Sequence, residues 1–404
     1  MKAIKQNTMP LSGVDKMKKY DFILVGGGVA GLTLAYQLVN SPLADRSILI
    51  IDRDAKTKND RTLSFWAEEP TLFDDIVYHA WNQITFASDE TAKEFNLGDY
   101  SYKTIRGIDL YRFVHEKLAA FSNVEFLRGR VETVEEGSEG AYVSVGEQRY
   151  FGQWVFDSRL KPFEFKHDPA FGKQVLRQYF KGWMLETAEP IFNPNNATLF
   201  DFRIPQADDM RFFYVLPFSE REALIEYVGL KHLAYDTIMQ DYVENTLKLK
   251  NYTVKPIEGG AILLTDRRFE RQASQHVLRI GSAGGMIKPS SGYAFTRILK
   301  DSKAIVNSLV NYGHPFKLPK VKPFYRFLDS QMIEAMNRFS GKMKVIFTAM
   351  FMHNPAQNIF RFLDETPTLW ELIALIASLP FKQLFIWTVL TDEKKKPSSQ
   401  PAIQ

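Results

Sequence analysis

Short apolar runs and an alternating stretch predict strands and one early helix in the first part of the chain. The runs at 22–25 and 47–51 are typical of buried strands, and a helical pattern between them extends to Leu38. Residues 211–228 alternate as the two strands of a hairpin do, with the turn at 217–221. These segments predict a chain of mixed α/β character.

From about residue 320 the pattern changes to helix-like, strongly apolar segments at 344–363 and 369–390. The second segment is interrupted by two charged residues and a proline, which makes it a poor membrane span. It fits two short amphipathic helices that lie in a membrane interface, with Trp370 and Trp387 as anchors. A helical cap buried against the rest of the protein is the alternative.

A glycine-rich turn, GGGVAG, separates the first predicted strand from the first helix. Its first glycine suits a tight turn, its third lets a pyrophosphate approach, and its last lets the helix pack closely on the strand. The second strand ends in an acid about twenty residues further on, where such sites bind a ribose hydroxyl. The pattern predicts a dinucleotide site whose cofactor-binding residues are Gly26, Gly28, Ala30, Gly31 and Asp52.

The later sequence favours FAD over NAD as the dinucleotide. A dehydrogenase that binds only a nicotinamide cofactor continues with regular βαβ repeats, whereas this chain breaks into DRTLSFW at 60–66 and then into mixed segments. A glycine-rich strand-to-helix turn returns only at 279–284, which is the layout of two-domain flavoproteins of the hydroxylase type.

We therefore predict a two-domain flavoprotein of class α/β (α+β). It combines a Rossmann-like FAD-binding domain of the hydroxylase/glutathione-reductase type, a β-sheet substrate domain and C-terminal helices. Disordered ends are expected at both termini. The expected ranges are 1–19 for the disordered lead-in, 20–80, 103–160 and 270–312 for the FAD-binding domain, 81–102 and 161–269 for the substrate domain, 313–391 for the helical region and 392–404 for the disordered tail.

The stretch ALIEYV, residues 223–228, places Glu226 inside an apolar strand. Alternation puts it on one face with Leu224 and Val228, and both faces are apolar. A carboxyl desolvated among apolar side chains keeps its proton, as an acid catalyst requires. An ordinary salt bridge, with Arg203 or Arg221, is the alternative.

Composition excludes several classes of function. A net charge of +4 is too small to indicate nucleic acid, and the absence of cysteine excludes disulfides, cysteine nucleophiles and thiolate metal sites. The seven histidines have no ligand spacing, so no metal is expected. The 32 Phe, 17 Tyr and 6 Trp suit a site for a large unsaturated ligand as well as an ordinary core.

Taken in order, these motifs resemble the flavin-dependent lycopene cyclases of carotenoid biosynthesis, in the bacterial and plant β-cyclase group. The likeness extends from about residue 20 to 380. It is carried by DFILVGGGVAGL with the acid of ILIID, RTLSFW, VFDSR, TLFDFR, FFYVLPFSEREALIEYV and IGSAGGMIKPSSGYAF. Many family members have paired acids at the strand motif, whereas here Tyr227 follows Glu226. Flavin hydroxylases have an aspartate at the position of Ser282, and cyclases commonly lack it as well.

The resemblance implies a lycopene β-cyclase, an isomerase (intramolecular lyase) that converts the ψ end groups of lycopene to β-ionone rings, by way of γ-carotene to β-carotene. It implies reduced FAD as the active cofactor, NADPH or NADH as reductant, and other acyclic or monocyclic carotenoids as further substrates. It also implies a peripheral position on the cytoplasmic side of a membrane. Whether one or both ends are cyclised, and whether a β or an ε ring results, stays open.

The same resemblance assigns residues to roles. Glu226 is the catalytic acid, although whether it or the flavin donates the proton stays open. Asp201 and Arg203 are the other catalytic candidates and are expected to shape the same pocket, and the alternative is that they are turn and sheet-edge charges. Val131 lies where this fold lets a backbone segment reach the adenine. The other cofactor-binding candidates are Arg61, Gly281, Ser282, Gly284, Gly292 and Tyr293.

Three other functions share the FAD motifs. An FAD-dependent monooxygenase or a prenyl-chain reductase acting on an isoprenoid has the same fold, but RTLSFW and the acidic strand argue against both. A non-enzymatic escort of lipidated proteins also uses this fold. The continuous late turn, with its SSGY, argues for a working flavin and against the escort.

Overall fold

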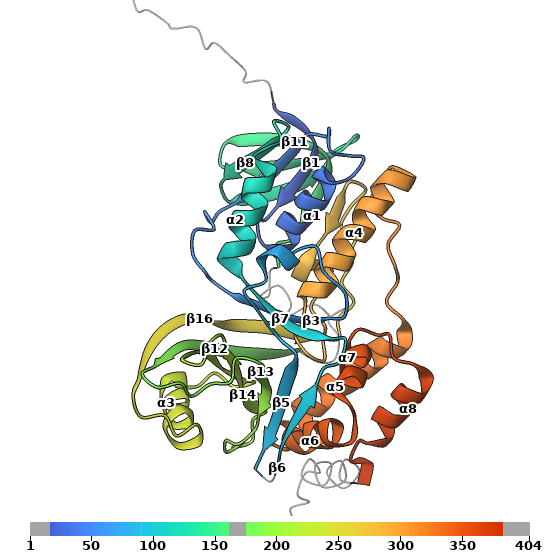
Figure 1. Cartoon of the computed structure of the whole chain (residues 1–404). Helices are drawn as coiled ribbons and strands as arrows, with labels where there is room; N and C mark the ends of the chain where they lie inside the picture. The colour runs from blue at the N-terminus through green and yellow to red at the C-terminus, as the bar shows by residue number, and fades with distance from the viewer. Residues whose placement is uncertain (1–16, 90, 161–174, 383–404) are drawn as a thin grey trace, which may run out of the picture.

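The computed structural model describes residues 17–89, 91–160 and 175–382. Its upper half in Figure 1 is built on a seven-stranded sheet with helices on one face. The strand order is β8-β2-β1-β11-β10-β9, with β17 also paired to β11. The pairs among β8, β2, β1, β11 and β17 are parallel, and those of β9 and β10 are antiparallel. These strands are β1 (Lys19–Val25), β2 (Ile48–Asp52), β8 (Val124–Arg128), β9 (Val131–Glu136), β10 (Ala141–Val145), β11 (Gln148–Asp157) and β17 (Val277–Arg279).

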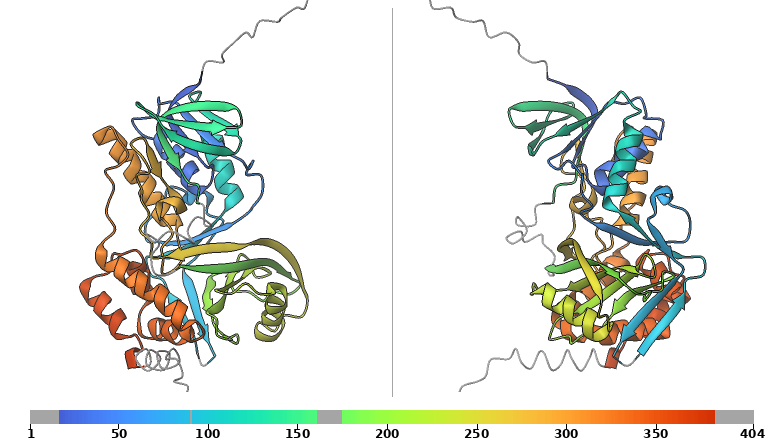
Figure 2. Two further views of the ribbon diagram at one scale, coloured as in Figure 1. Left: turned by 180° about the vertical axis from the view of Figure 1, so that it is seen from behind. Right: turned by 60° about the vertical axis from the view of Figure 1, so that its left-hand side comes forward.

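Three helices cover one face of this first sheet: α1 (Val29–Val39), α2 (Gly107–Leu118) and α4 (Phe295–Tyr312). Figure 2 shows β9, β10 and the start of β11 on the side away from α1 and α2. Because both faces are covered, the central strands are apolar throughout, and residues 48–51 of β2 are all buried. The predicted early strands and helix are confirmed.

A second seven-stranded sheet forms the lower half, in the order β16-β12-β15-β14-β13-β5-β6. The predicted hairpin is confirmed as the antiparallel pair β14–β15, although Pro217 still belongs to β14 and the connection covers 218–221. The strands are β5 (Gln83–Ser88), β6 (Thr91–Asn96), β12 (Val175–Thr187), β13 (Asn196–Asp201), β14 (Arg211–Pro217), β15 (Glu222–Gly229) and β16 (Tyr252–Thr265).

The two faces of the second sheet pack against different partners. One face, with Leu224 and Val228, joins a large apolar cluster that includes the C-terminal helices. The other face, with Ala223, Ile225 and Tyr227, packs on α3 (Tyr235–Asp241) and the π-helical turn Tyr242–Thr246. The alternation predicted for this strand is therefore confirmed.

A small sheet of β3 (Thr62–Ala67), β7 (Ser101–Arg106) and β4 (His79–Trp81) lies between the two large sheets. Apart from Lys19, the strands of the first sheet lie in the ranges predicted for the FAD-binding domain, and those of the second sheet in the ranges predicted for the substrate domain. The division into domains stays a prediction. The predicted disordered ends lie outside the described residues except for 17–19, of which Lys19 begins β1.

The C-terminal part forms α5 (Pro323–Arg338), α6 (Met343–His353), α7 (Ala356–Leu363) and α8 (Leu369–Ala377). Buried Lys288 links the late glycine-rich segment to this part, through ion pairs with Asp329 and Glu365 at 3.2 Å each. Among the described helices, none is both long and apolar enough to cross a membrane. The predicted anchor Trp370 is exposed on α8, and Trp387 lies outside the described residues.

Candidate active site

The early glycine-rich turn has the geometry of a dinucleotide site. Gly26 has φ +108°, and a Cβ there would lie 2.1 Å from the Ser158 hydroxyl oxygen. A Cβ on Gly31 would lie 2.0 Å from the Gly26 carbonyl oxygen, whereas nothing lies within 4 Å of the Cβ position of Gly28. The turn is thus closed toward the strand and open at Gly28, where a pyrophosphate would approach the start of α1.

Asp52 and the late turn complete this site. The Asp52 carboxylate accepts a hydrogen bond from the Gly27 N–H at 2.6 Å, so the acid lies directly beside the turn. The 3₁₀ turn Gly281–Gly284 follows β17 and contacts α1, since a Cβ on Gly281 would lie 2.8 Å from the Cβ of Ala30. Early and late motifs, far apart in sequence, therefore meet at one end of the first sheet.

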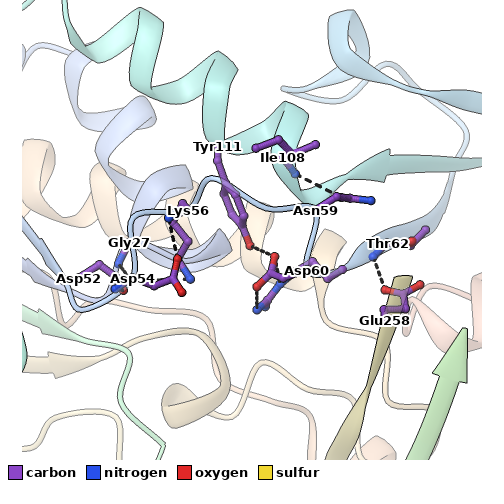
Figure 3. A network of polar contacts seen from close by, with 11 residues as sticks. Gly27, Asp52, Asp54, Lys56, Asn59, Asp60, Thr62, Ile108, Tyr111 and Glu258 are labelled. Atoms are coloured by element: carbon purple, nitrogen blue, oxygen red, sulfur yellow. Dashed lines mark hydrogen bonds and ion pairs between the residues drawn. The ribbon is translucent and has the colours of Figure 1, made fainter. Parts of the chain in front are cut away.

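The segment from Asp52 to Thr62 runs from the dinucleotide turn to the second sheet (Figure 3). Along it, the Tyr111 hydroxyl donates to Asp60 at 2.8 Å, and Asp60 pairs with Arg61 at 2.8 Å. The Thr62 N–H then donates to Oε2 of Glu258, a residue of β16, at 2.7 Å. This segment physically connects the predicted cofactor turn to an acid that the sequence reasoning had not identified.

Glu226 and Glu258 flank one glycine of the second sheet. Gly182 of β12 pairs with Glu226 on one side and with Glu258 on the other. A Cβ on Gly182 would lie 3.0 Å from Cγ and 3.4 Å from Oε1 of Glu258. Because the residue between them has no side chain, the two carboxyl groups face each other across β12.

The environment favours the protonated form of Glu226. Burial, and after it the nearby charge of Glu258, raises the pKa of Glu226 well above its ordinary value of 4.5. Burial also raises the pKa of Glu258, while the Thr62 hydrogen bond and the Arg61 charge act in the opposite direction. Both side chains keep part of their surface accessible.

Three tyrosines border the same region. The Tyr293 hydroxyl lies 3.1 Å from that of Tyr102 and 3.3 Å from that of Tyr214, which is the β14 neighbour of Glu226. Burial raises the pKa of all three phenols well above 10.0, and the nearby Glu226 carboxyl contributes to this. Tyr293, predicted to bind the cofactor, thus connects the segment after the late turn with the neighbourhood of Glu226.

Apolar side chains make up the remainder of this face. The partly buried side chains packed against the apolar cluster on this side of the sheet include Leu176, Phe180, Met184, Phe200, Phe218, Ile262, Ile287 and Met332. Gly292, with φ +78°, brings the late turn against β12, since its Cβ would lie 2.9 Å from Oε1 of Gln178. An apolar wall that also carries two acids can desolvate a hydrocarbon beside a proton donor.

The structure does not bring Asp201 and Arg203 to Glu226. Asp201 forms an ion pair with Arg203 at 2.6 Å and accepts a hydrogen bond from the Tyr242 hydroxyl at 2.6 Å. Its strand partner is Phe213, so it lies on the face that packs on α3. A register shift in β13 between Thr198 and Asp201 reverses the alternation and turns the carboxylate away from the acids. This corrects the expectation that the pair shapes the same pocket.

The salt-bridge alternative for Glu226 is not realised. Within the described ranges, Glu226 has no cationic group within 4.0 Å, and Arg203 pairs with Asp201 instead. Arg221 is exposed in the hairpin connection. No cluster of three or more potential metal-ligating residues occurs in the described part of the chain.

The remaining cofactor candidates are distributed along the first sheet. Ser282 and Gly284 lie in the late 3₁₀ turn beside Ala30. The Val131 carbonyl oxygen accepts a hydrogen bond from Arg159 at 3.0 Å, next to a cavity of about 400 Å³ at the end of β11. The backbone role of Val131 toward an adenine stays a prediction.

The sequence did not identify Glu258, because the residues around it predict a buried acid in a strand less clearly than ALIEYV does around Glu226. KPIEGGAILL places the acid before two glycines, which are typical of a turn. In the structure these glycines, Gly259 and Gly260, continue β16. An isolated acid in a run with isoleucines and leucines was the only signal available.

The chain is similar in sequence to proteins of one family. A family model described as lycopene cyclase protein matches residues 21–386. The lycopene beta cyclase of Capsicum annuum is 23% identical over 75% of this chain and 63% of its own length. That of Arabidopsis thaliana is 24% identical over 76% of this chain and 64% of its own length. The chain thus spans slightly less than two thirds of these relatives.

Solved structures resemble the fold at low sequence identity. A geranylgeranyl bacteriochlorophyll reductase-like protein from Thermoplasma acidophilum superposes with a TM-score of 0.57 at 12% identity, covering 92% of this chain and 100% of that one. The flavin-dependent brominase Bmp2 gives a TM-score of 0.55 at 14% identity, covering 94% and 100%. The predicted two-domain α/β flavoprotein fold is confirmed.

Proposed function

Because the chain belongs to the lycopene cyclase family, we propose that it is a lycopene β-cyclase, an isomerase that converts the ψ end groups of lycopene to β-ionone rings. The observation that carries the proposal is Glu226, an acid whose pKa is raised by burial in an apolar wall. A hydrocarbon has no polar handle, so its binding would rest on apolar area at about 25 cal/mol per Å². γ-Carotene would be the intermediate and β-carotene the product, and other acyclic or monocyclic carotenoids would be further substrates.

The proposed reaction is an isomerisation that Glu226 begins and ends. Its carboxyl O–H bond breaks as a C–H bond forms at the terminal alkene of the ψ end group, leaving a tertiary carbocation. The next double bond attacks this cation and closes the ring with a new C–C bond. The ring cation then loses a proton to the Glu226 carboxylate, so atoms and electrons balance without net oxidation.

The residues of the early and late turns fit FAD. The open space at Gly28 and the position of Asp52 beside Gly27 suit a pyrophosphate and a ribose. The late turn, with Gly281, Ser282 and Gly284, packs beside Ala30 at the start of α1 and would be a second contact for the cofactor. When bound and reduced by NADPH or NADH, the flavin would supply negative charge close to the acids. Gly292 and Tyr293 would be among the residues that hold it.

We also propose that α8 rests on the cytoplasmic side of a membrane, since the substrate dissolves in lipid. Leu369 and Trp370 are 68% and 78% exposed, Ile373 of the same helix is exposed, and so is Phe381 shortly after its end. Exposed apolar side chains gathered at one short helix suit an interfacial contact.

The test of function is the mass of the product after anaerobic incubation of the purified protein with lycopene, FAD and NADPH in lipid vesicles. A product of unchanged mass, altered retention and a blue-shifted spectrum is expected. An unchanged substrate, or a product two hydrogens heavier, as a prenyl-chain reductase makes, would contradict the proposal. A product one oxygen heavier, formed only in air, would indicate a monooxygenase. A protein that binds no flavin would point to the escort role.

The membrane proposal has a separate test in vesicle flotation. Replacing Leu369 and Trp370 together by alanine is expected to weaken binding on the order of tenfold, because apolar area is lost from the contact. The matched control is Ile191→Ala, an exposed apolar side chain outside the C-terminal helices. If the wild type, the double variant and the control bind vesicles equally, α8 does not contact the membrane.

A further inference from the structure

Four neighbouring strands of the second sheet, β14, β15, β12 and β16, align one row of residues on the face that carries Glu226. The row runs from Tyr214 through Glu226 and Gly182 to Glu258. Gly182 leaves a gap that a Cβ would fill at 3.0 Å from Glu258 and 3.1 Å from Leu224. Because Gly182 has no side chain, the Glu258 side chain extends from β16 over this position toward Glu226.

Glu258 is held at one oxygen and free at the other. Its Oε2 accepts a hydrogen bond from the Thr62 N–H at 2.7 Å (Figure 3). The segment that begins at the dinucleotide turn therefore orients the Glu258 carboxyl group. Its Oε1, on the side of Gly182, is buried and has no hydrogen-bond partner among the described residues. A buried carboxylate oxygen without a donor is costly, and a proton shared with the facing acid would satisfy it.

We propose that Glu226 and Glu258 act as one unit that holds a single proton, with Glu258 as the positioning residue that keeps this proton on Glu226. The inference rests on the proposed cyclisation for its purpose, although not for its geometry. Two carboxyl groups this close cannot both ionise readily, because the second negative charge would be placed beside the first in a dry region. Glu258 carries the charge, since it has the Thr62 N–H and Arg61 nearby.

The groups that face this pair determine its pH dependence. They are the phenols of Tyr102, Tyr214 and Tyr293, whose raised pKa keeps them neutral, and the Arg61 guanidinium on the Glu258 side. No cation neutralises Glu226 directly among the described residues within 4.0 Å. The negative charge of Glu258 is therefore the nearest charge that holds the proton in place.

The shared proton has a consequence for the reaction. After Glu226 donates its proton, the pair carries two negative charges, next to the carbocation that has formed. Opposite charges in a low-dielectric region attract strongly, so the pair would stabilise the cation and then take a proton back from the closed ring. Glu258 acts in this through Glu226 and need not touch the substrate.

The test is infrared difference spectroscopy of the purified holoprotein during a pH titration. The carbonyl band of a protonated carboxylic acid is expected at neutral pH and should be absent in Glu226→Gln. In Glu258→Gln the midpoint of this band should move about one to two pH units lower, because the neighbouring charge is gone. The alkaline limit of cyclisation should move with it. Glu186→Gln is the matched control, since Glu186 of β12 is paired with Glu222 of β15 in the same sheet but is exposed.

Each outcome decides the proposal. No protonated band in the wild type at neutral pH, or a band that Glu258→Gln does not move, overturns it. If Glu258→Gln does not fold, the wild type decides alone: two separate titration steps support the pair, and a single common step refutes it. A band that shifts as expected in a protein that forms no cyclised product supports the pair and refutes the cyclase.

Discussion

Asp201 and Glu226 are acids of the same sheet, but they lie on opposite faces with opposite kinds of partner. Asp201 is fully buried, pairs with Arg203 and accepts a hydrogen bond from Tyr242. Glu226 faces a second acid and phenols, in an apolar wall. Burial alone does not distinguish a stabilising acid from a reactive one. The partner does, because a cation compensates a buried charge whereas another acid keeps a proton in place.

The largest effect that would separate the two acids is on cyclisation. Glu226→Gln removes the proton donor and is expected to lower the rate of product formation about 10³-fold. Asp201→Asn should change the rate per folded molecule less than about threefold, since Asp201 lies on the other face. Carotenoid product measured by chromatography checks both. Similar losses of cyclisation rate in the two variants would contradict the assignment of a catalytic role to Glu226 and a structural role to Asp201.

The second effect is on stability, with the order reversed. Asp201→Asn is expected to lower the free energy of unfolding by about 2 kcal/mol, since Arg203 and Tyr242 lose a charged acceptor. The value lies below that of fully buried pairs because the Arg203 side chain is 41% exposed and water can solvate it. Urea denaturation measures the change. An unaltered midpoint would show that the ion pair adds nothing.

The third effect tests the gap between the two glutamates. Gly182→Val places methyl groups where a Cβ already lies 3.0 Å from Glu258 and 3.1 Å from Leu224. A roughly tenfold slower cyclisation is expected, because the carboxyl groups are forced apart while a β-branched residue still suits the strand. Gly259→Val is the control, since its Cβ would meet only the flexible Lys181 side chain and the Phe180 carbonyl at 3.4 and 3.5 Å.

The fourth effect is on the pH dependence of stability. The pKa of Glu226 is raised in the folded protein, so the folded state keeps a proton that the unfolded chain releases above its ordinary pKa of 4.5. Stability is therefore full below that value and falls as pH rises toward the folded pKa, by at most about 1.4 kcal/mol per pH unit. Relative to wild type, Glu226→Gln should gain stability as the pH rises above about 4.5. A difference that stays constant with pH would contradict the raised pKa.

Local sequence determined the elements that depend on neighbouring residues. The glycine turn between β1 and α1, the acid at the end of β2 and the β14–β15 hairpin all follow from short-range rules of turn geometry and alternation. The face of Glu226 also followed, because β15 has no bulge along its pairing with β14. The sequence pattern alone carried these predictions.

Only the tertiary structure decided which residues meet. The register shift in β13 that turns Asp201 to the far face leaves no mark in TLFDFR. The pairing of Glu226 with Glu258 depends on β12 lying between β15 and β16, and on a glycine at one position of it. Strand order and register are set by contacts between segments distant in sequence, and the hydrophobic pattern of any one segment does not contain them.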